Sequence, residues 1–100
     1  MLTQEKILEL LRNESSSLRD SFGVKRIGLF GSFAKKTQRH DSDVDIYVEF
    51  EKPIGFRFME FAEYMERLFN RKVDIVTFAG LRSIRIEDVA RDIERHMLYV

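Results

Sequence analysis

The chain has 100 residues with 17 Lys or Arg and 17 Asp or Glu, so its formal net charge is zero. This balance argues against binding to nucleic acid or to an anionic membrane through overall charge. The absence of Cys excludes a disulfide scaffold and thiolate metal sites, and a chain this short has room for one hydrophobic core, so we expect a single domain over residues 1–100.

The first predicted element is a helix over residues 3–22, where apolar side chains recur at roughly helical spacing. Thr3 is a suitable N-cap and Gly23 a suitable C-terminal stop. The serine run at residues 15–17 weakens the middle of this helix, because Ser side chains compete for backbone hydrogen bonds. A short buried strand follows over residues 26–30.

Strict alternation of apolar and polar residues predicts a strand over residues 43–50. Its apolar side chains face a core. The opposite face carries Asp43, Asp45, Tyr47 and Glu49. We therefore expect the carboxylates of this strand to project from the uncovered face of a sheet.

The second half of the chain predicts two more helices and one more strand. An apolar stripe predicts a helix over residues 56–70, and β-branched residues predict a strand over residues 72–78. The tail has apolar residues at helical spacing, namely Ile86, Val89, Ala90, Ile93 and Met97. The predicted fold class is thus α/β (α+β), with a small three-stranded mixed sheet and helices packed mainly on one face.

Asp43 and Asp45 form the first candidate site. Residues two apart on a strand share a face with Cα atoms about 6.6–6.8 Å apart, so both carboxylates can bind one divalent cation or bridge two. A solvated polar strand face is the alternative for such a pair alone. Asp74 lies in the middle of the third predicted strand, where Asp is disfavoured. If the two strands are neighbours, three carboxylates share one face, and Mg²⁺ with oxygen ligands fits the lack of Cys. Glu49 lies further along, and we interpret it as a surface residue, with a supporting role beside the site as the alternative.

Gly31 and Ser32 form the second candidate site, between the first strand and a short predicted helix over residues 33–36. Glycine allows close backbone approach to a ligand, and free N–H groups with a Ser hydroxyl can hold a phosphate. An ordinary turn is the alternative.

Residues 25–40 carry five basic residues and no acid, whereas residues 41–51 carry five acids and no base. Nucleotidyl transfer needs this combination, although two solvated charge runs would give the same pattern.

The order Gly31-Ser32-Phe33-Ala34, then Ser42-Asp43-Val44-Asp45, then a third Asp on a later strand, resembles the signature of the DNA polymerase β-like nucleotidyltransferase superfamily. The length and layout are similar to the minimal nucleotidyltransferases (MNT), which act as antitoxins to HEPN-domain toxins. The resemblance covers nearly the whole chain.

The resemblance implies a nucleotidyltransferase-like fold and a role for each candidate residue. Gly31, Ser32 and Lys35 would bind the triphosphate of ATP. The remaining three, Asp43, Asp45 and Asp74, would be the catalytic acids and would bind two Mg²⁺ ions, with Asp74 assisting deprotonation of the attacking hydroxyl. The implied activity is AMPylation: AMP passes from ATP to a tyrosine of a partner HEPN toxin, a ribonuclease, and pyrophosphate leaves.

Two positions depart from the usual pattern of that family. Lys35 and Lys36 stand where Arg and Gly are common. Lys35 keeps the positive charge but loses the bidentate fork of Arg. Lys36 in place of Gly implies either ordinary right-handed backbone geometry or strain.

Two alternative functions remain open at this stage. The chain could neutralise its toxin by binding alone, with an idle site, or it could modify a small molecule. In either toxin-related case we expect a complex with the partner, and Phe56 and Tyr64 are candidates for an apolar contact patch. No apolar run approaches the ~20 residues of a membrane-spanning helix, and the first residues lack the pattern of a signal peptide, so we expect a soluble cytoplasmic protein with no membrane contact.

Overall fold

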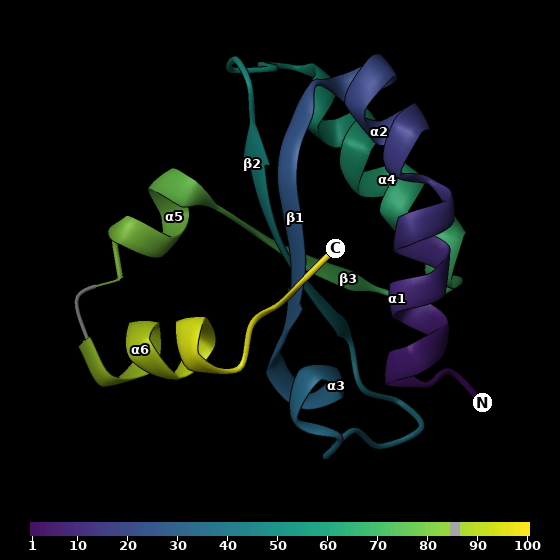
Figure 1. The fold of residues 1–100 in the computed structure, drawn as a ribbon, viewed down its shortest axis with the longest axis vertical. Helices are drawn as coiled ribbons and strands as arrows, with labels where there is room; N and C mark the ends of the chain where they lie inside the picture. Colours follow the sequence, from purple (N-terminus) through teal and green to yellow (C-terminus); the bar gives the residue numbers. More distant parts are fainter. Residues whose placement is uncertain (85–86) are drawn as a thin grey trace.

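The structure is a computed structural model that describes residues 1–84 and 87–100. Figure 1 shows the elements in chain order. They are α1 (Gln4–Asn13), α2 (Ser15–Phe22), β1 (Val24–Phe30), α3 (Gly31–Lys35), β2 (Val44–Phe50), α4 (Arg57–Phe69), β3 (Val73–Thr77), α5 (Phe78–Arg82), α6 (Glu87–Arg95) and β4 (Leu98–Tyr99). The predicted α/β fold class is confirmed.

The sheet is mixed, as predicted, and its strand order is β3-β2-β1-β4. Strand β1 pairs with β2 and with β4 in antiparallel fashion, whereas β2 and β3 are parallel. The described residues form four strands in this sheet, one more than the three expected. The additional strand, β4, has only two residues, which is too short for alternation to reveal it.

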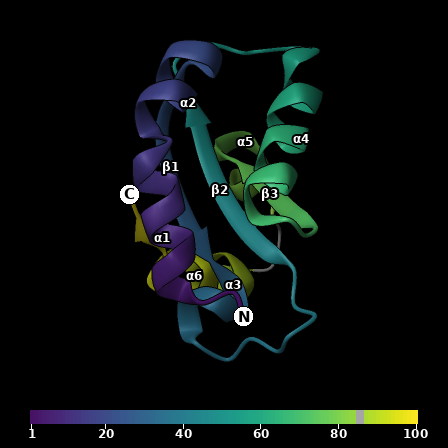
Figure 2. The same cartoon turned by 90° about the vertical axis from the view of Figure 1, so that its right-hand side faces the viewer.

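Helices cover both faces of the sheet, although unequally. The main core lies between the sheet and α1, α2 and α4, and includes the fully buried Ile7, Leu11, Phe61 and Met65. A smaller cluster of Phe30, Tyr47, Leu81 and Met97 lies on the side of α5 and α6. Figures 1 and 2 show α1, α2 and α4 on one side of the strands and α5 and α6 on the other. The face that carries the carboxylates is therefore partly covered.

The N-terminal helix of the prediction is divided in two at Glu14. The N-cap is Thr3, whose hydroxyl accepts a hydrogen bond from the Lys6 N–H at 3.1 Å. Gly23 ends α2 in the left-handed conformation with φ of 69°. Both predicted helix ends are thus confirmed, and the break falls directly before the serine run.

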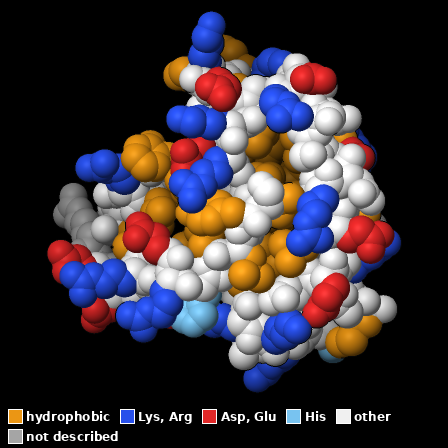
Figure 3. Space-filling model, viewed as in Figure 1, with side chains coloured by type: hydrophobic (Ala, Val, Ile, Leu, Met, Phe, Trp, Pro, Cys, Tyr) orange, Lys and Arg blue, Asp and Glu red, His pale blue; other side chains and the backbone are white. Residues whose placement is uncertain are grey.

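The two candidate contact aromatics differ in their surroundings. Phe56 is 99% exposed directly before α4. The ring of Tyr64 lies 5.8 Å from the ring of Phe22, and its hydroxyl donates to Glu14, so this side chain belongs to the packing of α4 on α2. Hydrophobic side chains are also visible over the sheet between the two helical layers (Figure 3).

The C-terminal part contains the predicted helix as α6, with Val89, Ala90 and Ile93 inside it, whereas Met97, also expected in the helical pattern, lies beyond its end at Arg95. Ile86, which was also expected in this helix, lies outside the described residues. Across residues 1–84 and 87–100, no helix combines the length and the apolar character needed to cross a membrane.

Candidate active site

Asp45 is the central residue of the site. It lies on β2 in register with Phe30, the last residue of β1, and with Asp74 of the parallel strand β3. Residues in register on neighbouring strands project from the same face, so the two carboxylates meet. Burial, followed by the negative charges of Asp74 and Asp43, raises the pKa of Asp45 to about 6. The site therefore concentrates negative charge around a partly buried carboxylate.

Asp43 lies one residue before β2, at the edge of the same site. Its carboxylate oxygen is 4.0 Å from the Lys72 ammonium, and the Val44 N–H donates to the Lys72 carbonyl at 3.1 Å. Within the described ranges, no three His, Cys, Asp or Glu side chains are grouped closely enough to hold a metal ion. The structure thus brings Asp45 and Asp74 together and places Asp43 beside Lys72.

Gly31 lies directly against Asp45. It is the first residue of α3 and has a φ of 74°, a conformation that residues with a side chain rarely adopt. A Cβ built on Gly31 would lie 2.8 Å from the Asp45 Cγ and would overlap a carboxylate oxygen. Glycine is therefore required here both for its positive φ and for its contact with Asp45. Through this contact, the predicted phosphate loop touches the predicted catalytic acid. Ser32 follows within the first turn of α3.

Helix α3 is anchored by Gln4, the first residue of α1. The side-chain amide of Gln4 donates to the carbonyls of Phe33 at 3.1 Å and of Ala34 at 2.9 Å. The Phe33 ring is fully buried in the main core. The sequence analysis missed Gln4, because a contact across 29 and 30 residues leaves no local pattern.

Lys36 stands where the family commonly has Gly, and we expected either right-handed backbone geometry or strain there. The structure shows the strained geometry. Lys36 ends α3 with φ of 59°, in the left-handed region. Its N–H donates to the Phe33 carbonyl at 3.3 Å, and the Thr37 N–H donates to the Ser32 carbonyl at 2.9 Å. This pair of bonds is the Schellman pattern, in which Gly is the favoured residue. The loop therefore keeps the glycine-type geometry without a glycine.

Lys35 reaches from α3 to α6. Its ammonium is 2.5 Å from a carboxylate oxygen of Asp92. The Glu49 carboxylate, by contrast, is engaged by other residues: it accepts a hydrogen bond from the Tyr47 hydroxyl at 2.6 Å and lies 3.8 Å from the Arg26 guanidinium. Glu49 was expected at the surface, and its side chain, 19% exposed, is more enclosed than that expectation.

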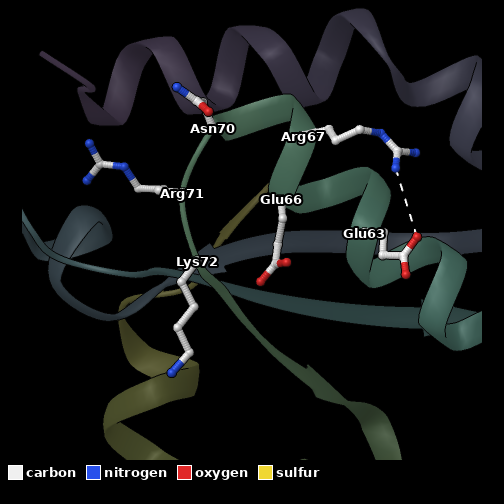
Figure 4. A pocket seen from close by; sticks show the side chains of 6 residues that line it. All are labelled: Glu63, Glu66, Arg67, Asn70, Arg71 and Lys72. Atoms are coloured by element: carbon white, nitrogen blue, oxygen red, sulfur yellow. Dashed lines mark ion pairs between the residues drawn. The ribbon is translucent and has the colours of Figure 1, made fainter.

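An open pocket adjoins the site where α4 leads into β3 (Figure 4). Its lining is strongly charged and consists of Glu63, Glu66, Arg67, Asn70, Arg71 and Lys72. Arg71 and Lys72 point away from the ion pair between Glu63 and Arg67. The Arg71 guanidinium donates to the Ser42 carbonyl at 2.9 Å and lies over the Phe33 ring at 5.6 Å, so this residue joins the acidic strand to α3. Nothing in the local sequence identified it.

Comparison with known proteins agrees with this geometry. A nucleotidyltransferase-domain family model matches residues 8–100. The protein adenylyltransferase MntA of Thermococcus cleftensis is 41% identical over 101 residues, which cover 100% of this chain and 98% of the relative.

Two solved structures have the same fold. A minimal nucleotidyltransferase superposes with a TM-score of 0.73 at 28% identity, over 97% of this chain and 95% of the other. A chain in a crystal structure of a toxin–antitoxin with AMP-PNP superposes with a TM-score of 0.62 at 26% identity, over 98% of this chain and 72% of the other. The chain therefore belongs to the nucleotidyltransferase-domain family and is an enzyme of that family, related to the MntA protein adenylyltransferases.

Proposed function

We propose that the chain is an antitoxin that transfers AMP from ATP to a tyrosine of a partner HEPN toxin and releases pyrophosphate. The observation that carries the proposal is the contact of Gly31 with Asp45, which itself lies in register with Asp74. This contact joins a backbone suited to phosphate with a pair of carboxylates. The relationship to MntA of Thermococcus cleftensis supports protein as the acceptor, and the toxin–antitoxin structure with AMP-PNP supports a toxin partner and an adenine nucleotide.

The donor nucleotide is assigned to the α3 end of the site. Gly31 and Ser32 bind the triphosphate through backbone N–H groups and the Ser hydroxyl, and Lys35 contributes a positive charge within reach of the same loop. Gln4 and Arg71 hold α3 in place, so that a charged ligand meets a fixed backbone.

Asp45 and Asp74, the pair that the strand register brings together, are the centre of the proposed Mg²⁺ site, and Asp43 at its edge would complete it. Asp43, Asp45 and Asp74 offer only oxygen ligands, which hard cations prefer. Burial, followed by the negative charges of Asp74 and Asp43, raises the pKa of Asp45, and a bound cation would favour its charged form. Asp43, Asp45 and Asp74 would hold two ions. Bound Mg²⁺ supplies stabilisation of the negative charge that develops on the transferred phosphate.

The chain's own residues then orient the acceptor and take its proton. The acceptor tyrosine oxygen attacks the α-phosphorus of ATP, the bond between the α-phosphorus and the bridging oxygen breaks, and pyrophosphate leaves with that oxygen. The hydroxyl proton passes to a carboxylate oxygen of Asp74, which is exposed on β3 and open to an incoming protein. This exposure favours a large acceptor.

The location and assembly follow from this assignment. We propose that residues 1–100 form one domain that acts in the cytoplasm, where ATP and a toxic ribonuclease both occur. The acceptor surface then comes from the toxin, so the working unit is a complex of the two proteins.

The test is transfer of label from α-labelled ATP to the purified HEPN partner in the presence of Mg²⁺. We expect labelled partner with the wild type, loss of label with the Asp43→Ala/Asp45→Ala double variant, and full labelling with Asp20→Ala, an exposed acid on α2. The same three proteins are assayed for neutralisation of the toxin in cells. If the double variant still neutralises and no protein labels the partner, the antitoxin acts by binding alone and the proposal is wrong.

A further inference from the structure

The Lys35 ammonium forms an ion pair within the protein. It lies 2.5 Å from the Asp92 carboxylate of α6, across 57 residues of sequence. Figures 1 and 2 both show α6 beside α3. The other carboxylate oxygen of Asp92 is 3.4 Å from Nδ1 of His96, one turn later in the chain. Asp92 is thus contacted on one carboxylate oxygen by Lys35 and on the other by His96, the residue that follows α6.

The remaining attachment of α6 is weak. None of the described side chains in this helix is buried, and it contacts the small cluster through the partly buried Ala90 and Ile93. The pair of Lys35 and Asp92 is therefore a principal polar link between α6 and the end of α3. The hydrogen bond from Lys35 also lowers the pKa of Asp92, which keeps this carboxylate charged at neutral pH.

A triphosphate bound at Gly31 and Ser32 competes with Asp92 for the same ammonium. We infer that Asp92 is a positioning residue that holds Lys35 on α6 and weakens nucleotide binding, so that the link between α3 and α6 opens when ATP binds. This inference rests on the proposed assignment of Lys35 to the triphosphate. Asp92 can weaken nucleotide binding in two ways: it competes for Lys35, and its charge repels the phosphates directly. Removal of the carboxylate ends both effects, so both predict tighter nucleotide binding in the variant.

The experiment measures the Kd of AMP-PNP with Mg²⁺ by titration calorimetry on the full chain. Asp92→Asn is expected to lower the Kd about three- to tenfold, which is the effect expected from the removal of one nearby charge at a solvated site. Asp92→Glu keeps the charge and is expected to keep the wild-type Kd. Glu94→Gln is the matched control: it removes one exposed acid from the same helix and is expected to change nothing. In the transfer assay, Asp92→Asn is expected to lower the KM for ATP and leave kcat unchanged.

A double variant separates competition for Lys35 from simple repulsion. Lys35→Met is expected to raise the Kd, and adding Asp92→Asn to it is expected to have no further effect. An equal tightening by Asp92→Asn in both backgrounds would overturn the inference, and so would an unchanged or raised Kd in the single variant. Nucleotide binding by the wild type without transfer to the toxin would overturn only the proposed function, whereas absence of AMP-PNP binding by the wild type would overturn both.

Discussion

The Cα of Gly31 lies so close to the carboxylate of Asp45 that a methyl group on Gly31 would come within 2.8 Å of the Asp45 Cγ. The two residues are 14 positions apart, yet Phe30 and Asp45 are in register across β1 and β2. The strand pairing therefore places the first residue of α3 against the acid directly. The loop that is proposed to hold the triphosphate and the acid that is proposed to hold Mg²⁺ are therefore in direct contact.

Gly31→Ala is predicted to slow AMP transfer by about 100-fold through displacement of Asp45. The new methyl group must push the carboxylate away, and a shift of about 1 Å in a catalytic group costs on the order of 100-fold in rate. The substitution also costs about 1 kcal/mol of stability or more, because φ is positive. Labelling rates and urea unfolding measure the two effects.

Gly55→Ala is the matched control for Gly31→Ala. Gly55 also has a positive φ, of 58°, but a Cβ there meets nothing within 4 Å. We expect a similar loss of about 1 kcal/mol from backbone strain and no loss of transfer. Equal activity in the two variants would show that contact with Asp45 does not constrain position 31.

Asp45 is predicted to lower the stability of the protein above pH 6. Its pKa is about 6 in the folded state against an ordinary value of 3.8, through burial and then the charges of Asp74 and Asp43. Between these two values the folded state binds more protons than the unfolded chain, so the free energy of unfolding falls as pH rises. We expect Asp45→Asn to be more stable than the wild type by about 1–2 kcal/mol at pH 7.5, after discounting for solvent screening. The difference should shrink toward pH 4.

Mg²⁺ should offset this loss of stability in every protein that keeps Asp45. At pH 7.5 the cation compensates the carboxylates, so added Mg²⁺ is expected to raise the Tm of the wild type more than that of Asp45→Asn. Asp20→Asn, an exposed acid on α2, is the control and should respond like the wild type. A lower stability of Asp45→Asn at pH 7.5 would contradict both the sign and the cause.

The local sequence was sufficient to predict the acidic strand but not its surroundings. Alternation over residues 43–50 predicts β2 and the common face of its polar residues, and an apolar stripe predicts α4. The meeting of Asp45 with Asp74 depended on an assumed strand pairing, which the parallel register confirms. Gln4 and Asp92 were missed, because their partners on α3 are 29 or more residues away and no periodicity encodes such contacts.

Lys36→Gly is predicted to stabilise the protein. Lys36 has φ of 59° at the end of α3, where a residue with a Cβ costs about 1 kcal/mol relative to Gly. The ion pair of Lys36 with Glu5, at 2.9 Å, is largely exposed and contributes little. We expect a gain of about 0.5–1 kcal/mol in urea unfolding with unchanged transfer.

Asn70→Gly serves as the comparison for the gain in stability that is expected from Lys36→Gly. Asn70 has φ of 52° at the end of α4, but Asn tolerates the left-handed region better than Lys does. Its replacement should therefore give a smaller gain than that of Lys36. A larger gain at Asn70 would show that backbone strain is not what limits stability at Lys36.

Tyr47→Phe is predicted to affect stability and not activity, although Tyr47 shares a strand face with Asp45. Its hydroxyl is buried and donates to Glu49 at 2.6 Å, and burial raises its pKa above the ordinary value, so it stays protonated. Removal of this hydroxyl leaves Glu49 beside Arg26 and costs about 1 kcal/mol in urea unfolding. Tyr99→Phe is the control, because the Tyr99 ring keeps its contact with the Arg26 guanidinium at 3.7 Å. Loss of a purely structural hydrogen bond lowers stability and leaves the rate of transfer unchanged. A tenfold loss of transfer in Tyr47→Phe with normal stability would therefore place Tyr47 and Glu49 in the active site.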